Sequence, residues 1–146
     1  NLAEAAALAG RPVRDVAGMR DAARAIRDLG PRAVLVKGGH LGDAACDVLL
    51  DGEDLRELAA PRLDVAPLHG SGCTLSAAIT ALLARGTTLL DAVRTAKDWV
   101  HAAIARAPAV GRGARPLDHG VRPPLPDDDP PAPVAPAPGR GYGRRS

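Results

Sequence analysis

Aromatic residues and cysteines are both scarce in this 146-residue chain. Trp99 and Tyr142 are the only tryptophan and tyrosine, and phenylalanine is absent, which argues against a surface on which nucleic-acid bases stack. The two cysteines, Cys46 and Cys73, are too few for a disulfide framework and lack the CxxC spacing of common zinc sites. The formal net charge is only +2 and the basic residues are scattered, so we expect no nucleic-acid partner.

Long apolar runs are missing as well. No stretch approaches the roughly 20 apolar residues of a membrane-spanning helix. The first residues also lack the charged-then-apolar pattern of a signal peptide. We therefore expect a cytoplasmic protein with no membrane partner.

The prolines are distributed unevenly along the chain. Eight of the 14 lie between Val121 and Pro138, in a segment without apolar periodicity. Such a segment buries too little apolar surface to offset the entropy lost on ordering. We therefore predict a disordered tail rich in proline and arginine over residues 120–146, and a globular part over residues 1–119.

Helical and strand patterns alternate in the globular part. Helical periodicity is expected over residues 1–10, 15–30, 73–85 and 89–107, and strand patterns cover residues 33–37, 45–51 and 55–64. Asn1 and Asp15 are candidate N-caps. The last two strand patterns flank Asp51-Gly52, a turn signal that predicts an antiparallel hairpin. This order of elements predicts an α/β fold, and one side of its third helix would carry Leu75, Ile79, Leu82 and Leu83.

The stretch "HGSGC", residues 69–73, is the first candidate site. Gly70 and Gly72 allow backbone conformations in which successive amides converge, and a helix beginning at Cys73 would add its dipole. Together they would make an anion hole suited to a phosphate or to a phosphoryl group in transfer. A plain glycine-rich start of a helix is the alternative, and it is favoured by this motif alone. Cys73 itself is either a small buried hydrophobe or a base or nucleophile.

The stretch "VKGGHLGD", residues 36–43, is the second candidate. Lys37 ends a predicted strand, where open α/β sheets bind ligands, and would meet a phosphate. Gly38 and Gly39 would let the ligand approach the backbone closely. A tight turn with a solvated lysine is about equally favoured by these residues. We expect His40 to line the loop rather than to act in catalysis.

Asn1 and Glu4 form the third candidate. Their spacing puts both on one helix face, and their oxygens suit Mg²⁺ or its bound waters. A capping box is the stronger alternative. The two roles are compatible only if the cap leaves Glu4 free.

These three stretches, in this order, resemble the hydroxymethylpyrimidine and phosphomethylpyrimidine kinases of thiamine biosynthesis. The segments that carry the resemblance are "NLAEA", "AVLVKGGHLGDAACDVLLDG" and "HGSGCTLSAAITALLARG", and it extends from Asn1 to about His119. The resemblance implies a ribokinase-like fold, a central sheet flanked by helices. It also implies ATP and Mg²⁺ as cofactors, and hydroxymethylpyrimidine and its monophosphate as substrates. A homodimer of the intact protein is compatible with it.

The resemblance also assigns roles to residues. Cys73 stands where most ribokinase-like enzymes have the aspartate that takes the proton of the substrate hydroxyl. The anion-hole turn corresponds to Gly70, Ser71 and Gly72, with serine in place of the commoner threonine. Asn1 and Glu4 match an Asn-x-x-Glu motif linked to Mg²⁺ and phosphate. The loop that lies along the nucleotide corresponds to Lys37, Gly38, Gly39, His40 and Leu41.

The N-terminal half of the family, which holds most pyrimidine contacts, has no counterpart in this sequence. We therefore expect a C-terminal fragment that carries the ATP and anion-hole half and is inactive alone. A pyridoxal-type vitamin kinase and a non-catalytic nucleotide-binding fragment remain alternatives. A cysteine hydrolase or phosphatase using Cys73 with His69 is disfavoured, because "CTLSAAIT" offers no arginine to hold a phosphate.

Overall fold

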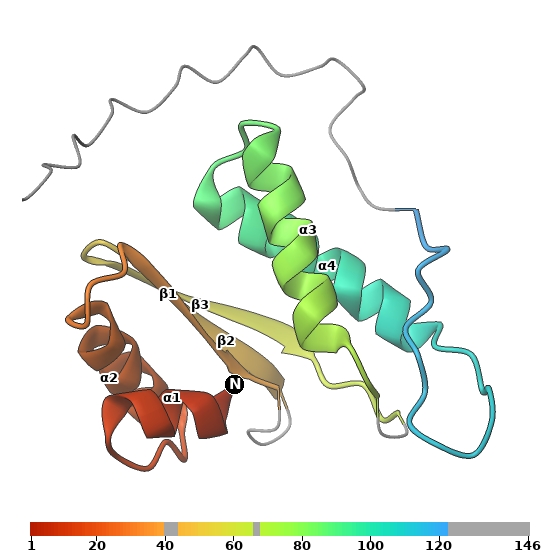
Figure 1. The fold of residues 1–146 in the computed structure, drawn as a ribbon, viewed down its shortest axis with the longest axis horizontal. Helices are drawn as coiled ribbons and strands as arrows, with labels where there is room; N and C mark the ends of the chain where they lie inside the picture. The colour runs from red at the N-terminus through yellow and green to blue at the C-terminus, as the bar shows by residue number, and fades with distance from the viewer. Residues whose placement is uncertain (40–43, 66–67, 123–146) are drawn as a thin grey trace, which may run out of the picture. The chain divides into compact units, whose positions relative to one another are not determined.

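A computed structural model of the chain describes residues 1–39, 44–65 and 68–122 (Figure 1). The predicted disordered tail, residues 120–146, therefore lies outside the described residues from residue 123 onward. The chain divides into two compact units, Asn1–Ala66 and Pro67–Ser146, and each is described by itself. Within the described ranges, no helix combines the length and the apolar character needed to cross a bilayer.

Two helices open the first unit, and both begin at their predicted caps. Helix α1 spans Leu2–Ala9 and ends at Gly10, whose φ of 67° is the left-handed conformation typical of a helix end. Helix α2 spans Val16–Arg27, and the Asp15 carboxylate accepts a hydrogen bond from the Gly18 amide at 2.7 Å. This helix ends three residues before Gly30, whose amide donates to the Arg27 carbonyl in the turn that follows.

Three antiparallel strands complete the first unit in the order β1-β2-β3. They span Ala33–Gly38, Ala44–Asp51 and Asp54–Pro61. The predicted hairpin is confirmed, with Asp51 paired to Asp54. Its two-residue loop is Gly52 and Glu53, one position later than the turn signal. Gly52 has a φ of 58°, which suits the first loop residue of a type II′ hairpin.

The core of the first unit lies between its helices and one face of the sheet. Met19 of α2 is fully buried there against Val36, Val48 and Leu50 of β1 and β2. Ala22 and Ala23 share the same helix face, and their small side chains let the helix approach the strands. In β1 only Val36 and Gly38 are fully buried, because successive side chains of a strand point to opposite faces.

Two helices form most of the second unit. Helix α3 spans Ser71–Ala84 and is followed by Gly86 with a φ of 83°, and helix α4 spans Leu89–Ala105 with Thr88 as its N-cap. The predicted inner face of α3 is only partly confirmed. Leu75 and Leu82 are buried, but Leu83 is 40% exposed because it lies about 100° around the helix from Leu82.

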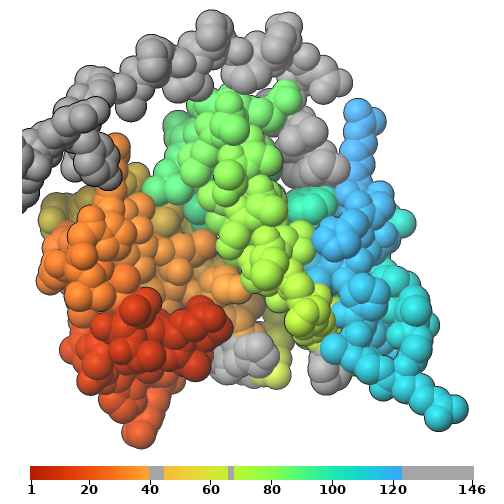
Figure 2. Space-filling model, viewed as in Figure 1, coloured from red at the N-terminus to blue at the C-terminus, as the bar shows by residue number. Residues whose placement is uncertain are grey.

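The segment after α4 returns along the helix pair. The amide of Asp118 donates to the Ala103 carbonyl at 3.1 Å, and the indole of Trp99 donates to the Val121 carbonyl at 2.8 Å. The same segment reaches the residues before α3, where the His69 amide donates to the Arg115 carbonyl at 3.1 Å. In the space-filling view, this blue segment lies next to the yellow-green start of α3 (Figure 2). The segment therefore holds the residues that lead into α3, where the first candidate site lies.

Candidate functional site

The first candidate site is the start of α3. Gly70 is the N-cap, with φ 89° and ψ −3°, a left-handed conformation that favours glycine. The helix begins at Ser71, so the predicted start at Cys73 is two residues late. Cys73 is therefore the third helical residue, and Ser71 and Gly72 belong to the first turn.

Three backbone amides at this helix start have no partner among the described residues. The first intrahelical bond joins the Thr74 amide to the Gly70 carbonyl at 2.9 Å, so the amides of Ser71, Gly72 and Cys73 precede it. Gly70 offers no side chain to cap them. Unpaired amides and the helix dipole favour an anion at this position, and the anion hole itself stays a prediction.

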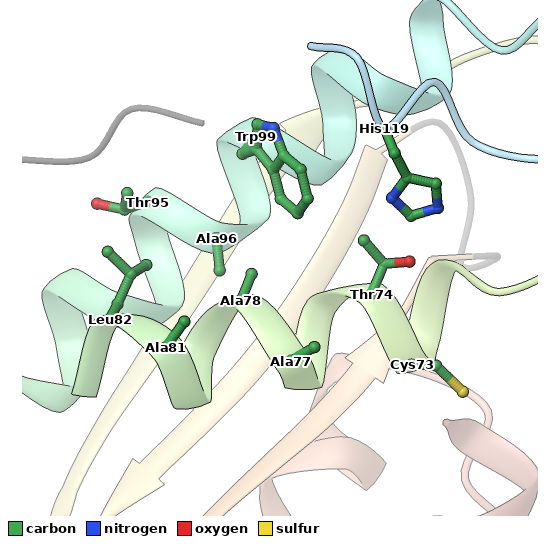
Figure 3. A pocket seen from close by; sticks show the side chains of 10 residues that line it. All are labelled: Cys73, Thr74, Ala77, Ala78, Ala81, Leu82, Thr95, Ala96, Trp99 and His119. Carbon is green, nitrogen blue, oxygen red and sulfur yellow. The ribbon is translucent and has the colours of Figure 1, made fainter. Parts of the chain in front are cut away.

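Cys73 is exposed at this helix start. Figure 3 shows its sulfur directed away from Trp99 and His119. The alternative of a small buried hydrophobe is therefore wrong for Cys73. His69 is exposed as well, and no hydrogen bond joins it to Cys73 in the described part of the chain. The structure thus gives no support to a cysteine–histidine hydrolase pair.

The second candidate site is the end of β1, and its two described glycines differ. A Cβ on Gly38 would collide with the Cys46 carbonyl and would lie 2.8 Å from the Met19 side chain, so packing requires glycine there. An added Cβ on Gly39 meets no atom within 4 Å, and Gly39 is exposed. Only Gly39 therefore leaves room for a ligand at the backbone. His40 and Leu41 lie outside the described residues.

The third candidate site, Asn1 with Glu4, is a complete capping box. The Glu4 amide donates to Asn1 Oδ1 at 3.0 Å, and the terminal amine of Asn1 donates to Glu4 Oε2 at 2.8 Å. This hydrogen bond and the charge of the amine lower the pKa of the Glu4 carboxyl, and the Lys37 ammonium adds to the effect. The start of α1 lies beside the end of β1 (Figure 1), so the first unit brings the second and third candidate sites together.

The donor set of the third site suits Mg²⁺ in chemistry but not as a complete cage. Asn1 and Glu4 provide amide and carboxylate oxygens, the ligand type that Mg²⁺ prefers. One Glu4 oxygen is already engaged by the cap. Among residues 1–39, 44–65 and 68–122, no three His, Cys, Asp or Glu side chains converge into a metal site. These two residues therefore suit an ion that keeps most of its waters.

A cavity of about 590 Å³ lies between α3 and α4, and the sequence pattern does not predict it. Its walls are mostly small or apolar side chains, which leave space between the helices (Figure 3). The rings of Trp99 and His119 form one end, with their centroids 6.4 Å apart. The run of alanines in α3 was the available signal, but it does not show which residues of α4 lie opposite. The lining comprises Cys73, Thr74, Ala77, Ala78, Ala81, Leu82, Thr95, Ala96, Trp99 and His119.

The family of the chain follows from comparison with known proteins. The model of the phosphomethylpyrimidine kinase family matches residues 1–118. The chain belongs to this family. The hydroxymethylpyrimidine/phosphomethylpyrimidine kinase of Streptomyces coelicolor is 47% identical over 120 residues, which cover 82% of this chain and 45% of that protein. The Rhizobium meliloti kinase is 50% identical over 123 residues, covering 82% and 46%. This member of the family therefore spans about half the length of these relatives.

Solved structures of related kinases share the fold of this chain. Bacillus subtilis pyridoxal kinase in complex with ADP has a TM-score of 0.79 and 38% identity, covering 83% of this chain and 48% of that one. Staphylococcus aureus pyridoxal kinase in complex with AMP-PCP has a TM-score of 0.79 and 36% identity, covering 83% and 45%. Clostridium difficile phosphomethylpyrimidine kinase has a TM-score of 0.58 and 35% identity, covering 71% and 41%. The predicted ribokinase-like α/β fold is confirmed.

Proposed function

We propose that residues 1–119 form part of a kinase domain that transfers a phosphoryl group from ATP to hydroxymethylpyrimidine and then to its monophosphate. The uncapped start of α3 carries the proposal, because its first turn combines three amides that have no partner among the described residues with an exposed thiol. Such a constellation stabilises negative charge and offers a base at the same point. Membership of the phosphomethylpyrimidine kinase family supports the choice of substrate.

In the proposed reaction, Cys73 accepts the proton of the substrate hydroxyl. The hydroxyl oxygen forms a bond to the γ-phosphorus as the bond from that phosphorus to the bridging oxygen of ADP breaks. The amides of Ser71, Gly72 and Cys73 stabilise the charge on the moving phosphoryl oxygens. Gly70 leaves these amides free for the phosphoryl group, because it begins the helix in a left-handed conformation and has no side chain to cap them.

The first unit would bind the nucleotide phosphates. Lys37 supplies a positive charge, and the exposed Gly39 allows close approach. We extend the proposal to Gly38, His40 and Leu41 as the rest of the nucleotide loop, by the family pattern.

Asn1 and Glu4 would hold Mg²⁺ or its waters beside the phosphates. When bound, the ion would neutralise charge on the phosphates.

A chimera tests the activity. Residues 1–119 of this chain replace the matching region of the Streptomyces coelicolor kinase, and phosphorylation of hydroxymethylpyrimidine and its monophosphate is followed with ATP. We expect turnover by the chimera and none by residues 1–146 alone. A folded chimera that does not phosphorylate either pyrimidine would contradict the proposed function. Turnover by residues 1–146 at the rate of an intact kinase would contradict the fragment prediction.

A binding experiment separates catalysis from binding alone. ATP is titrated into ¹⁵N-labelled chain, and the amide signals of Ser71, Gly72 and Cys73 are followed. We expect these three signals to shift together, because the phosphates would accept hydrogen bonds from them. Binding without turnover, in a folded chimera as well, would favour a non-catalytic nucleotide-binding role. Sedimentation of the chimera tests the expected homodimer.

Pyridoxal phosphorylation is the second candidate. The observation that favours it is the higher TM-score to the two pyridoxal kinases than to the Clostridium difficile phosphomethylpyrimidine kinase. The sequence relatives favour the pyrimidine instead. Competition between the two substrates in the chimera decides the question, with the ratio of their kcat/KM values as the readout.

A further inference from the structure

Asp47 is a buried carboxylate that the proposed reaction does not use. It lies in the middle of β2 and is only 6% exposed. Its Oδ1 accepts a hydrogen bond from the Gly38 amide at 3.0 Å. Gly38 is the last residue of β1, so this bond joins the middle of one strand to the end of its neighbour.

Strand packing alone does not account for an aspartate at this position. Removing a carboxylate from water is costly unless hydrogen bonds compensate, and a β-branched apolar residue would suit a buried strand better. Val48 and Leu49, the two residues that follow Asp47 in β2, are apolar and buried, as packing requires. The side chain of Asp47 therefore serves its hydrogen-bond partner rather than the core.

The bond completes a set of contacts that fixes Gly38 from several sides. The Cys46 carbonyl and the Met19 side chain leave no space for a Cβ on Gly38, and Asp47 holds its amide. In the β1–β2 register, Asp47 also lies directly opposite Lys37. Directly opposite residues share a sheet face, so the carboxylate and the lysine stem are neighbours. Lys37 and Gly39, the residues on either side of Gly38, are the ones proposed to contact phosphate.

We propose that Asp47 is a positioning residue that fixes the end of β1, and with it Lys37 and Gly39, for the phosphates of a nucleotide. The proposal rests on the nucleotide-binding part of the proposed function. Asp47 acts through the Gly38 backbone and the sheet face it shares with Lys37, and it does not touch the ligand. Its removal should therefore loosen one strand end and weaken phosphate binding without unfolding the sheet.

The test compares four variants of the full chain. Asp47→Ala and Asp47→Val remove the acceptor, and Val keeps a residue suited to a buried strand. Asp47→Asn keeps a neutral oxygen acceptor. Asp54→Ala is the control, because Asp54 is exposed at the hairpin and lies at the end of the sheet opposite to Gly38. Amide hydrogen exchange of Gly38 and of β2, the melting temperature and the Kd of ADP are measured for each variant.

Loss of the acceptor should speed exchange of the Gly38 amide by about 10- to 100-fold, the range expected for a hydrogen bond to a charged group. The Kd of ADP should rise by about 10-fold in the same two variants. Exchange in β2 should stay within about twofold of wild type once global stability is subtracted. Asp47→Asn should recover most of the protection and affinity, and Asp54→Ala should resemble wild type.

Two results would overturn the positioning role. One is unchanged Gly38 exchange in folded Asp47→Val. The other is a uniform increase throughout the sheet, which would make Asp47 a general contributor to stability. If Asp47→Ala does not fold, Asp47→Val decides. Failure of wild type to bind ADP would contradict the nucleotide function, whereas the Gly38 exchange still reports on whether Asp47 holds the strand end.

Discussion

The starts of α1 and α3 solve the same physical problem in opposite ways. Each helix leaves its first amides without intrahelical partners. In α1, a reciprocal capping box gives the Glu4 amide and the Asn1 amine side-chain partners. In α3, the cap is Gly70, which has no side chain, and the amides of the first turn remain unpaired among the described residues.

The difference means that an external anion would gain more at the start of α3 than at the start of α1. A capped helix start has already met part of its hydrogen-bonding requirement, so it gains less from a ligand. An uncapped one gains hydrogen bonds and a favourable dipole interaction when a phosphate arrives. Helices α2 and α4 have side-chain caps, Asp15 and Thr88, so they belong with α1. Leaving α3 without a side-chain cap lowers its stability, and anion binding would be a functional reason for that loss.

The largest effect is expected from the thiol at the uncapped start. In the chimera, Cys73→Ala should lower kcat by roughly 10²- to 10⁴-fold, because a general base contributes about that factor. ATP affinity should change little, since the backbone amides remain. Cys73→Asp should recover part of the rate, because a carboxylate can accept the same proton. Cys46→Ala is the control. A folded Cys73→Ala chimera with near-normal kcat would mean that the thiol does not act as the base.

The two glycines at the ends of α3 provide a matched pair for the next effect. Gly70 and Gly86 have φ values of 89° and 83°, and an added Cβ meets no atom within 4 Å at either. Alanine at either position should cost about 1–3 kcal/mol of unfolding free energy through backbone strain. Only Gly70→Ala should also weaken ATP binding. Equal nucleotide affinity for the two variants, measured by calorimetry beside thermal melts, would remove Gly70 from the anion hole.

The capped start of α1 should respond more weakly. Asn1→Ala should cost about 1 kcal/mol of stability, the usual value of an N-cap. Thr88→Ala removes the cap of α4 and serves as the control for a cap away from the proposed metal residues. If Glu4 also serves Mg²⁺, Glu4→Gln in the chimera should raise the Mg²⁺ concentration needed at saturating ATP. An unchanged Mg²⁺ titration would leave Glu4 with the cap alone.

Local patterns were enough to predict most of the elements. Caps such as Asn1 and Asp15 act on amides two or three residues away, so a short stretch of sequence contains the whole interaction. The hairpin was predictable for the same reason, although its loop is one residue later because Gly52 takes the first loop position. The α3 start was placed two residues late because glycine is a weak helix former, whereas here Gly72 follows a left-handed cap.

The unpredicted features depend on contacts between distant segments. The sequence pattern predicts room for a ligand at Gly38, but Met19 of α2 and the Cys46 carbonyl occupy that space. The cavity between α3 and α4 requires knowing which alanine faces Ala96 and where Trp99 is held by the Val121 carbonyl. Sequence periodicity identifies a helix face but does not identify its neighbour. The glycine cap of α3 was predictable from its residues, whereas the contacts of the segment after α4 with the residues before α3 were not.

The smallest effect concerns the pH at which the α1 cap loosens. The terminal amine, first by hydrogen bond and then by charge, lowers the pKa of Glu4 from 4.5, and Lys37 contributes less. Because the folded-state pKa is below the unfolded value, the cap's contribution to stability is complete above pH 4.5. It is lost as the pH falls through the lowered folded value. Acetylation of the amine should raise the pKa of Glu4 more than Lys37→Met does. Titration of the Glu4 carboxyl by NMR measures both shifts, and the reverse order would mean that the strand end, rather than the cap, controls this carboxylate.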